Sequence, residues 1–277
     1  MATQAVKKIY RGVVSYLQYW RGNPTSTYKT IQDIPFYIRN PYDEPVTVTF
    51  EKYTNDTSAA RNYRSVKVYY KNSPDPSVGW TLLGTTTTKL AEYPTINIPA
   101  HSTIYFGGEP LNDGAWGYYS SRYSLYFYNI IKGAPIVGGN IMSLLRRNDF
   151  VKNHTIYEYS FYRTLRSTAL IDASELLMPS TTLAKGCYRE MFGNSTSLVN
   201  APKLPAPILV NECYYGMFDG CSSLNNITCL AEDISANNCT YHWVNEVSAA
   251  GTFTKKAGVT WVTNNSGIPK NWTVQEA

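Results

Sequence analysis

The amino-acid sequence predicts a mainly β protein, in which an N-terminal antiparallel β-sandwich is followed by a short solenoid of α/β repeats with a C-terminal cap. Apolar and polar residues alternate with period 2 in short segments across residues 31–138, and one pattern recurs every 26 residues between Leu183 and Trp243. The composition changes from the first pattern to the second at Gly138–Gly139. We therefore predict one domain over residues 31–138 and another over residues 139–277.

Residues 1–30 precede the predicted sandwich and mix apolar with polar residues up to the sequence Arg-Gly-Asn-Pro at 21–24. We interpret them as an N-terminal strand or an extended anchoring arm, with a short helix as the alternative. The first ten residues carry charge but lack the apolar stretch of a signal peptide, and no apolar run reaches about 18 residues anywhere in the chain. We expect neither an export signal nor a membrane anchor.

The predicted sandwich consists of short segments in which apolar residues alternate with polar ones, separated by turn signals about ten residues apart. A cluster of turn residues at 40–45 separates the first two segments and predicts a β-hairpin. No strand–helix–strand alternation is present, which disfavours a parallel α/β fold. The segments expected to be strands are 36–39, 46–51, 66–71, 80–83, 95–98, 103–106 and 123–131.

An aromatic segment interrupts the predicted sandwich, and its first part, 109–122, is expected to be a loop. Aromatic side chains on such a loop can stack on sugars or bind a partner protein. The alternative is that they pack against the edge of the sandwich. The candidate ligand or partner contacts are Trp116, Tyr118, Tyr119 and Tyr123.

The repeat begins with the motif Cys-Tyr-x-x-Met-Phe at Cys187, and the motif recurs at Cys213, while Cys239 opens a third copy. Repetition at this period is the mark of a solenoid, in which each unit buries its apolar face by stacking on its neighbours. The predicted repeat core comprises Cys187, Tyr188, Met191, Phe192, Leu198, Cys213, Tyr214, Met217, Phe218, Leu224 and Cys239.

Each repeat unit is predicted to contain one helix and one strand. Apolar side chains in residues 209–218 follow the spacing of a helical stripe, and residues 223–230 are expected to be extended. Residues 156–183 are interpreted as a degraded first repeat. The Trp-rich C-terminal end, with Trp261 and Trp272, is predicted to cap the last unit, because an exposed repeat face would be a large apolar patch.

Cysteine usage favours packing over chemistry. Four of the five cysteines lie at repeat positions, which indicates a stacked column of small buried side chains. A disulfide between adjacent units is the alternative, and the spacing of the cysteines does not decide it. No Cys-x-x-Cys pair is present and the three His are dispersed, so zinc is disfavoured and we expect no metal and no cofactor.

The formal net charge of +5 comes from scattered basic residues in the N-terminal half, and no basic helix or run accompanies it, so we expect no nucleic-acid binding. The chain has 24 tyrosines among 277 residues. A thin Tyr-rich sandwich with exposed strand edges favours self-association, and we expect a homodimer or homotrimer.

The run from Thr182 to Ala206, with its Cys-Tyr-x-x-Met-Phe, Ser-Leu and Leu-Pro elements, resembles the BspA-like leucine-rich repeats of Bacteroidetes surface proteins and of the phages that infect them. The resemblance covers about residues 139–277. It implies a leucine-rich-repeat solenoid that functions in adhesion or recognition. Combined with the lack of a visible export signal, it implies a virion protein of a crAss-like phage, of the head-fibre, decoration or tail-fibre type.

Three functions compete at this point. In the favoured one, residues 1–138 dock on other virion proteins or on further copies of the chain, and residues 139–277 bind a host surface protein or glycan. A bacterial cell-surface adhesin is the alternative. A fibre-borne glycan hydrolase would need two carboxylates across a cleft, and only Glu109 with Asp113, or Glu232 with Asp233, are near each other in sequence. We therefore predict no enzymatic activity and no catalytic residues.

Overall fold

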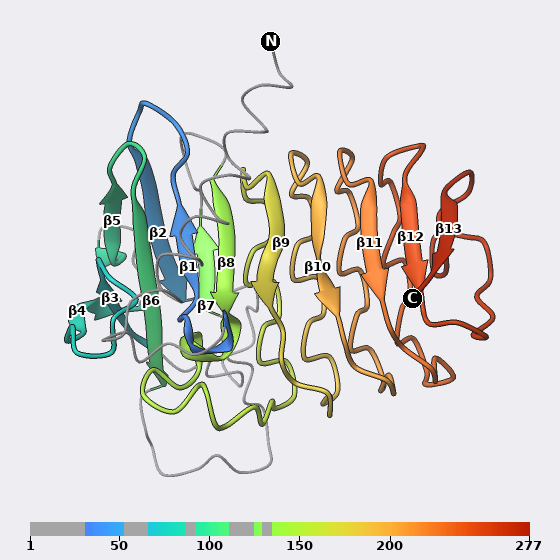
Figure 1. Ribbon diagram of the computed structural model, residues 1–277, viewed down its shortest axis with the longest axis horizontal. Helices are drawn as coiled ribbons and strands as arrows, with labels where there is room; N and C mark the ends of the chain where they lie inside the picture. The colour runs from blue at the N-terminus through green and yellow to red at the C-terminus, as the bar shows by residue number, and fades with distance from the viewer. Residues whose placement is uncertain (1–30, 53–65, 87–91, 111–124, 129–134) are drawn as a thin grey trace.

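The computed structural model describes residues 31–52, 66–86, 92–110, 125–128 and 135–277 (Figure 1). The protein is mainly β, as predicted. The described residues contain thirteen strands in two sheets, together with the short 3-10 helices η1 (Ile31–Asp33) and η3 (Ile141–Leu144), and they contain no α-helix.

One mixed sheet of ten strands runs the length of the molecule (Figure 1). In spatial order its strands are β13 (Thr273–Glu276), β12 (Thr252–Lys255), β11 (Asn226–Cys229), β10 (Asn200–Leu204), β9 (Asp172–Leu177), β8 (Ile136–Asn140), β1 (Tyr37–Arg39), β6 (Thr103–Pro110), β3 (Val66–Lys71) and β4 (Thr81–Thr85). The strands from β8 to β13 are parallel, whereas those from β8 to β4 are antiparallel.

Strand β8 is the point at which the two pairing modes meet. It pairs antiparallel with β1 on one side and parallel with β9 on the other. The expected boundary between residues 138 and 139 therefore falls inside a strand that belongs to both halves. Ser143, just after β8, accepts a hydrogen bond from Phe36 N at 2.9 Å and donates one to Phe106 O at 2.8 Å, which ties the halves together.

The second sheet has three strands, β5 (Thr95–Ile98), β2 (Val46–Lys52) and β7 (Leu125–Tyr128). Its buried side chains pack against the ten-stranded sheet in one continuous core, where the Phe50 ring lies 5.3 Å from that of Phe106. Most strands lie where the period-2 alternation predicts them. β7 covers part of the predicted 123–131 strand, and the other residues of that segment lie outside the described ranges.

The predicted hairpin between the first two segments is wrong, because β1 and β2 belong to different sheets. The turn cluster at 40–45 carries the chain across the core. The buried Asn40 side chain holds this crossing, since its Nδ2 donates to Glu44 O at 2.7 Å and to Ile98 O at 3.2 Å.

In the repeat region each parallel strand alternates with a segment of consecutive turns, and we call one turn segment with its following strand a rung. The predicted helix over 209–218 is wrong, because residues 211–220 form turns. Every fourth residue there, Glu212, Gly216 and Gly220, has positive φ. Along the segment, one peptide N–H donates to the carbonyl three residues earlier, and the following N–H donates to a carbonyl of the next rung. Tyr214 N, for example, donates to Cys239 O at 2.8 Å. Hydrogen bonds between rungs thus take the place of the hydrogen bonds of an α-helix. The spacing of the apolar residues is compatible with either structure.

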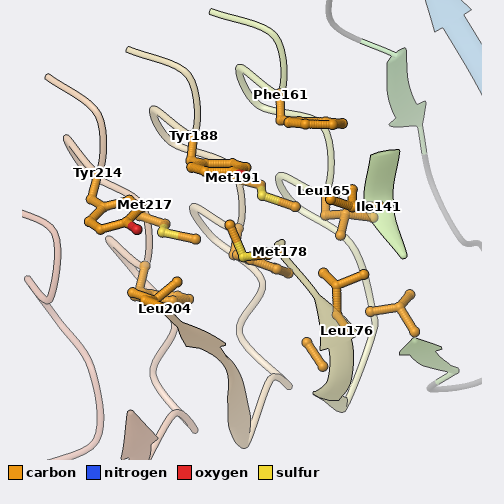
Figure 2. Packing of buried hydrophobic residues seen from close by; sticks show 14 of the residues in the cluster. Ile141, Phe161, Leu165, Leu176, Met178, Tyr188, Met191, Leu204, Tyr214 and Met217 are labelled. Atoms are coloured by element: carbon orange, nitrogen blue, oxygen red, sulfur yellow. The ribbon is translucent and has the colours of Figure 1, made fainter. Parts of the chain in front are cut away.

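The interior of the rungs is filled by side chains that stack on their counterparts in the next rung (Figure 2). All eleven residues predicted as the repeat core are at most 3% exposed. Aromatic rings form a continuous stack in which successive centroids are 5.6 to 6.2 Å apart up to Trp243, and Trp261 follows at 5.5 Å. The stack contains Phe161, Tyr188, Tyr214, Trp243 and Trp261.

All five cysteines are buried as free thiols inside this stack of rungs. Burial raises the pKa of Cys187, Cys221 and Cys229 to about 12. At neutral pH these side chains are protonated and serve as small apolar groups.

The chain past Cys239 continues the rung pattern in space, where the sequence motif is lost. Turns at 237–246 lead into β12, and β13 adds one more parallel strand. Trp261 and Trp272 are 8% and 7% exposed and cover the last rungs, and Trp272 Nε1 donates to Ser248 O at 2.8 Å.

Candidate binding surface

The four aromatic residues predicted as ligand or partner contacts, Trp116, Tyr118, Tyr119 and Tyr123, lie outside the described residues. The eleven repeat-core residues are interior packing residues and do not form an accessible site. A candidate binding surface must therefore be sought on the outside of the rungs.

The carboxylates weighed for hydrolysis have structural partners. Glu109 accepts hydrogen bonds from Arg147 at 3.1 Å and from the Tyr69 hydroxyl at 3.0 Å, whereas Asp113 lies outside the described residues. Asp233 accepts a hydrogen bond from Ser235 N at 2.9 Å; hydrogen bonds from Ser235 lower the pKa of its carboxyl group. Glu232 lies 3.7 Å from Lys256.

The turn side of the rungs carries a column of side chains that share one repeat position, namely Arg163, Arg189, Tyr215 and Tyr241. The Arg189 guanidinium lies 4.0 Å from the centroid of the Tyr215 ring, and the Tyr241 ring follows at 5.1 Å. The His242 ring stacks on that of Tyr241 at 4.1 Å. Because these rings stack on their neighbours, their faces are already used within the protein.

The charges of the turn side also neutralise one another. Glu190, with a side chain only 12% exposed, lies 2.8 Å from Arg163 and 2.7 Å from Arg166. Glu212 pairs with Arg189 and accepts a hydrogen bond from the Tyr159 hydroxyl at 3.3 Å. Burial and, next, the Glu212 carboxylate raise the pKa of Tyr159. The polar groups of this side are largely committed to intramolecular contacts.

The strand side is arranged differently. Side chains alternate across each strand, so the buried Ile227 and Phe253 place their neighbours on the outer face of the sheet. Strand pairing aligns these outer residues in two rows, which we call the strand-face rows. The first row contains Asp172, Asn200, Asn226, Thr252 and Thr273; the second contains Lys203, Thr228, Thr254 and Gln275.

The strand-face rows keep most of their hydrogen-bonding capacity. Asn200 Nδ2 donates to Asp172 Oδ2 at 3.0 Å. Within the described part of the chain, no side-chain hydrogen bond or ion pair joins the other seven residues of the rows to another protein group, and these groups face solvent. The rows carry one acidic and one basic residue, so their formal charges cancel.

The functional groups of the strand-face rows are suited to binding a ligand. Hydroxyl, amide and ammonium groups repeated at the strand spacing of about 4.8 Å can form many parallel hydrogen bonds with a ligand. Across the described ranges, no group of three or more His, Cys, Asp or Glu residues could hold a metal ion. No helix found in those ranges is long and apolar enough to cross a membrane.

Sequence reasoning missed the strand-face rows because exposed Asn and Thr residues form no recognised motif. The 26-residue period contains the signal, since Asn200, Asn226 and Thr252 are separated by that interval, as are Thr228 and Thr254. Aligning the repeats beneath one another at their strand positions would have found the rows. Only the register of the sheet shows that both rows share one face.

Comparison of the chain with protein-family models, with curated proteins and with solved structures found no match.

Proposed function

We propose that the protein is a non-enzymatic attachment protein, whose repeat half binds a ligand on the host cell surface through the strand-face rows. The observation that carries this proposal is the contrast between the two sides of the rungs. The charged groups of the turn side largely pair with one another, whereas the rows present aligned polar groups with few intramolecular partners.

In this proposal the antiparallel half is a β-sandwich and the repeat half is a BspA-like leucine-rich-repeat solenoid with a C-terminal cap. Support for the sandwich comes from the contact of Phe50 with Phe106 between the two sheets. The regular hydrogen bonds between rungs, on both the turn side and the strand side, support the solenoid. The motif at Cys187 and Cys213 supports the BspA-like type.

The setting proposed for this attachment protein is the surface of a phage virion, as a head fibre, decoration protein or tail fibre. The support is the resemblance of the repeats to those of Bacteroidetes surface proteins and their phages. Residues 1–138 would then join the chain to other virion proteins or to further copies of itself, and residues 139–277 would face the host surface protein or glycan.

Cell binding by the purified full-length chain tests the attachment function. We expect labelled protein to bind Bacteroidetes host cells, and the double variant Thr228→Val and Thr254→Val to bind them more weakly, because two adjacent hydroxyls are lost at constant shape. The matched control is Tyr241→Ala on the turn side. If the control lost binding and the double variant retained it, the strand side would not be the binding surface.

Purified particles test the setting. Mass spectrometry of virions from infected Bacteroidetes cultures should detect the chain at a copy number that matches a symmetric structural component. Recovery of the chain from the surface of uninfected cells, and not from particles, would overturn the virion setting in favour of a bacterial adhesin. That outcome would leave the binding surface itself unchanged.

A further inference from the structure

The strand-face rows are regular in a way that restricts the shape of the ligand. Asn226 pairs in register with Thr252, which pairs with Thr273, and Thr228 likewise pairs with Thr254, which pairs with Gln275. Equivalent groups therefore repeat once per strand, about 4.8 Å apart, along a line perpendicular to the strands. A ligand that used the whole of this surface would be a linear polymer with a similar repeat length.

The side chains of the rows restrict the chemistry of the ligand. The rows consist mainly of hydroxyl and amide groups, which both donate and accept hydrogen bonds. Their two charged residues, Asp172 and Lys203, cancel, and Asp172 already accepts from Asn200 and from Ser174 N. Such a surface complements a neutral polymer rich in hydroxyl groups, and it lacks the concentrated charge that attracts an acidic or basic one.

A folded protein partner fits this face less well. Protein interfaces obtain most of their binding energy from a few Trp, Tyr or Arg anchors, whereas neither row contains an aromatic or Arg residue. Two of the apolar residues between the rows, Ile227 and Phe253, are fully buried and point away from the face, whereas Val274 on the terminal strand β13 is 45% exposed.

We propose that the strand-face rows bind a single extended chain of a neutral polysaccharide, which lies perpendicular to the strands with about one sugar ring per strand. Successive pyranose rings of an extended chain advance by roughly the distance between neighbouring strands. Each ring over β10 to β13 therefore meets the same pair of side-chain positions, and a ring over β9 meets Asp172 of the first row. The proposal rests on the attachment function proposed above and names the ligand class of the same surface.

The test uses surface polysaccharide extracted from the cells that bind the protein, freed of protein by proteinase, separated into neutral and acidic fractions, and partly hydrolysed to chains of graded length. Calorimetry with the full-length protein should detect binding to the neutral fraction. Affinity should rise with chain length and level off at about five sugars, the number of strands from β9 to β13. The Thr228→Val and Thr254→Val double variant should bind about tenfold more weakly, and Tyr241→Ala should bind as the parent does.

Binding that is independent of chain length, or confined to the acidic fraction and abolished by salt, would overturn the proposal. So would cell binding that disappears after proteinase treatment of the cells but survives periodate oxidation of their glycans. In that last case the double variant would still bind cells poorly, so the attachment function would stand without its polysaccharide ligand. If the double variant bound untreated cells normally, the attachment proposal itself would fail.

Discussion

The turn side and the strand side of the rungs share one period and one interior, yet they use their outer polar groups in opposite ways. On the turn side, Glu190 and Glu212 neutralise the arginines around them, and Tyr215 lies between Arg189 and Tyr241. On the strand side, the hydroxyls of Thr228 and Thr254 form no hydrogen bond with any other residue that the structure describes. A repeated sequence can therefore pair most of the charged groups of one face within the protein and leave the polar groups of the other face available for a ligand.

The comparison implies a gradient in the cost of substitution. Interior residues have the most contacts to lose, turn residues have conformational requirements, and strand-face residues contribute little to stability. We therefore expect substitutions in the interior, on the turn side and on the strand face to lower the free energy of unfolding by progressively smaller amounts.

The interior thiols should make the protein sensitive to alkaline pH. Folded Cys187, Cys221 and Cys229 have a pKa of about 12, above the unfolded value of about 8.5. Their contribution to stability is complete below pH 8.5 and is lost as the pH rises toward 12. At pH 10 each thiol ionises in the unfolded chain, which lowers the free energy of unfolding by about 2 kcal/mol per thiol, or about 6 kcal/mol for the three.

Denaturant unfolding under reducing conditions at pH 7 and pH 10 measures this loss. A Cys229→Ala variant is the control, because it keeps every other titrating group. Its stability should fall by about 2 kcal/mol less between the two pH values than that of the parent. Identical losses in both proteins would show that Cys229 does not contribute to the pH dependence.

The aromatic stack should be the most sensitive place for a single substitution at neutral pH. Trp243 contacts the rings of Tyr214 and Trp261, and its Nε1 donates to Gly267 O at 2.8 Å. Trp243→Ala should therefore lower the free energy of unfolding by about 3–5 kcal/mol. Tyr241→Ala, two residues away on the turn side and 41% exposed before substitution, should cost about 1 kcal/mol. If chemical denaturation gave equal losses of unfolding free energy for Trp243→Ala and Tyr241→Ala, the expected difference between interior and turn side would be contradicted.

The sequence predicted the strands well because half-buried strands alternate by necessity. It could not assign the strands to sheets. The turn cluster after Arg39 is compatible both with a hairpin and with a crossing between sheets. The crossing depends on the hydrogen bond from Asn40 to Ile98, which is distant in the sequence. Only contacts between residues far apart in the chain resolve such a choice.

The failed helix prediction has a local cause. Consecutive turns place apolar side chains inward at nearly the same intervals as a helix, so the spacing of Cys213 and Met217 does not separate the two structures. The available signal was the interval of four between Gly216 and Gly220, both at positive φ. Glu190 and His242 adopt positive φ at equivalent places without being glycine, which hides that signal in the other rungs.

The turn side should be sensitive to backbone conformation. Gly220 has a φ of 74°, and an added Cβ would lie 2.3 Å from Asn194 Oδ1. Gly220→Ala should lower the free energy of unfolding by about 2 kcal/mol, through left-handed strain and displacement of Asn194. Gly258 has a φ of 79° with nothing within 4 Å of the added Cβ, so Gly258→Ala should cost about 1 kcal/mol.

Thermal and denaturant unfolding of the two glycine variants separates the two contributions. Equal losses would assign the whole effect at Gly220 to its backbone angle, and the packing against Asn194 would then be irrelevant. A larger loss at Gly220, as expected, shows that neighbouring rungs are in contact along the turn side.

Substitutions on the strand face should affect stability less than substitutions in the interior or on the turn side. Valine matches threonine in shape and favours strands equally, so Thr228→Val and Thr254→Val together should change the free energy of unfolding by no more than about 0.5 kcal/mol. Neither hydroxyl bonds to another group within the described residues, so its removal leaves no protein donor or acceptor unpaired. A loss above about 2 kcal/mol would mean that these hydroxyls help to hold the rungs together, and the contrast between the two sides would disappear. If stability is unchanged while cell binding falls, the threonines act on the ligand and not on the fold.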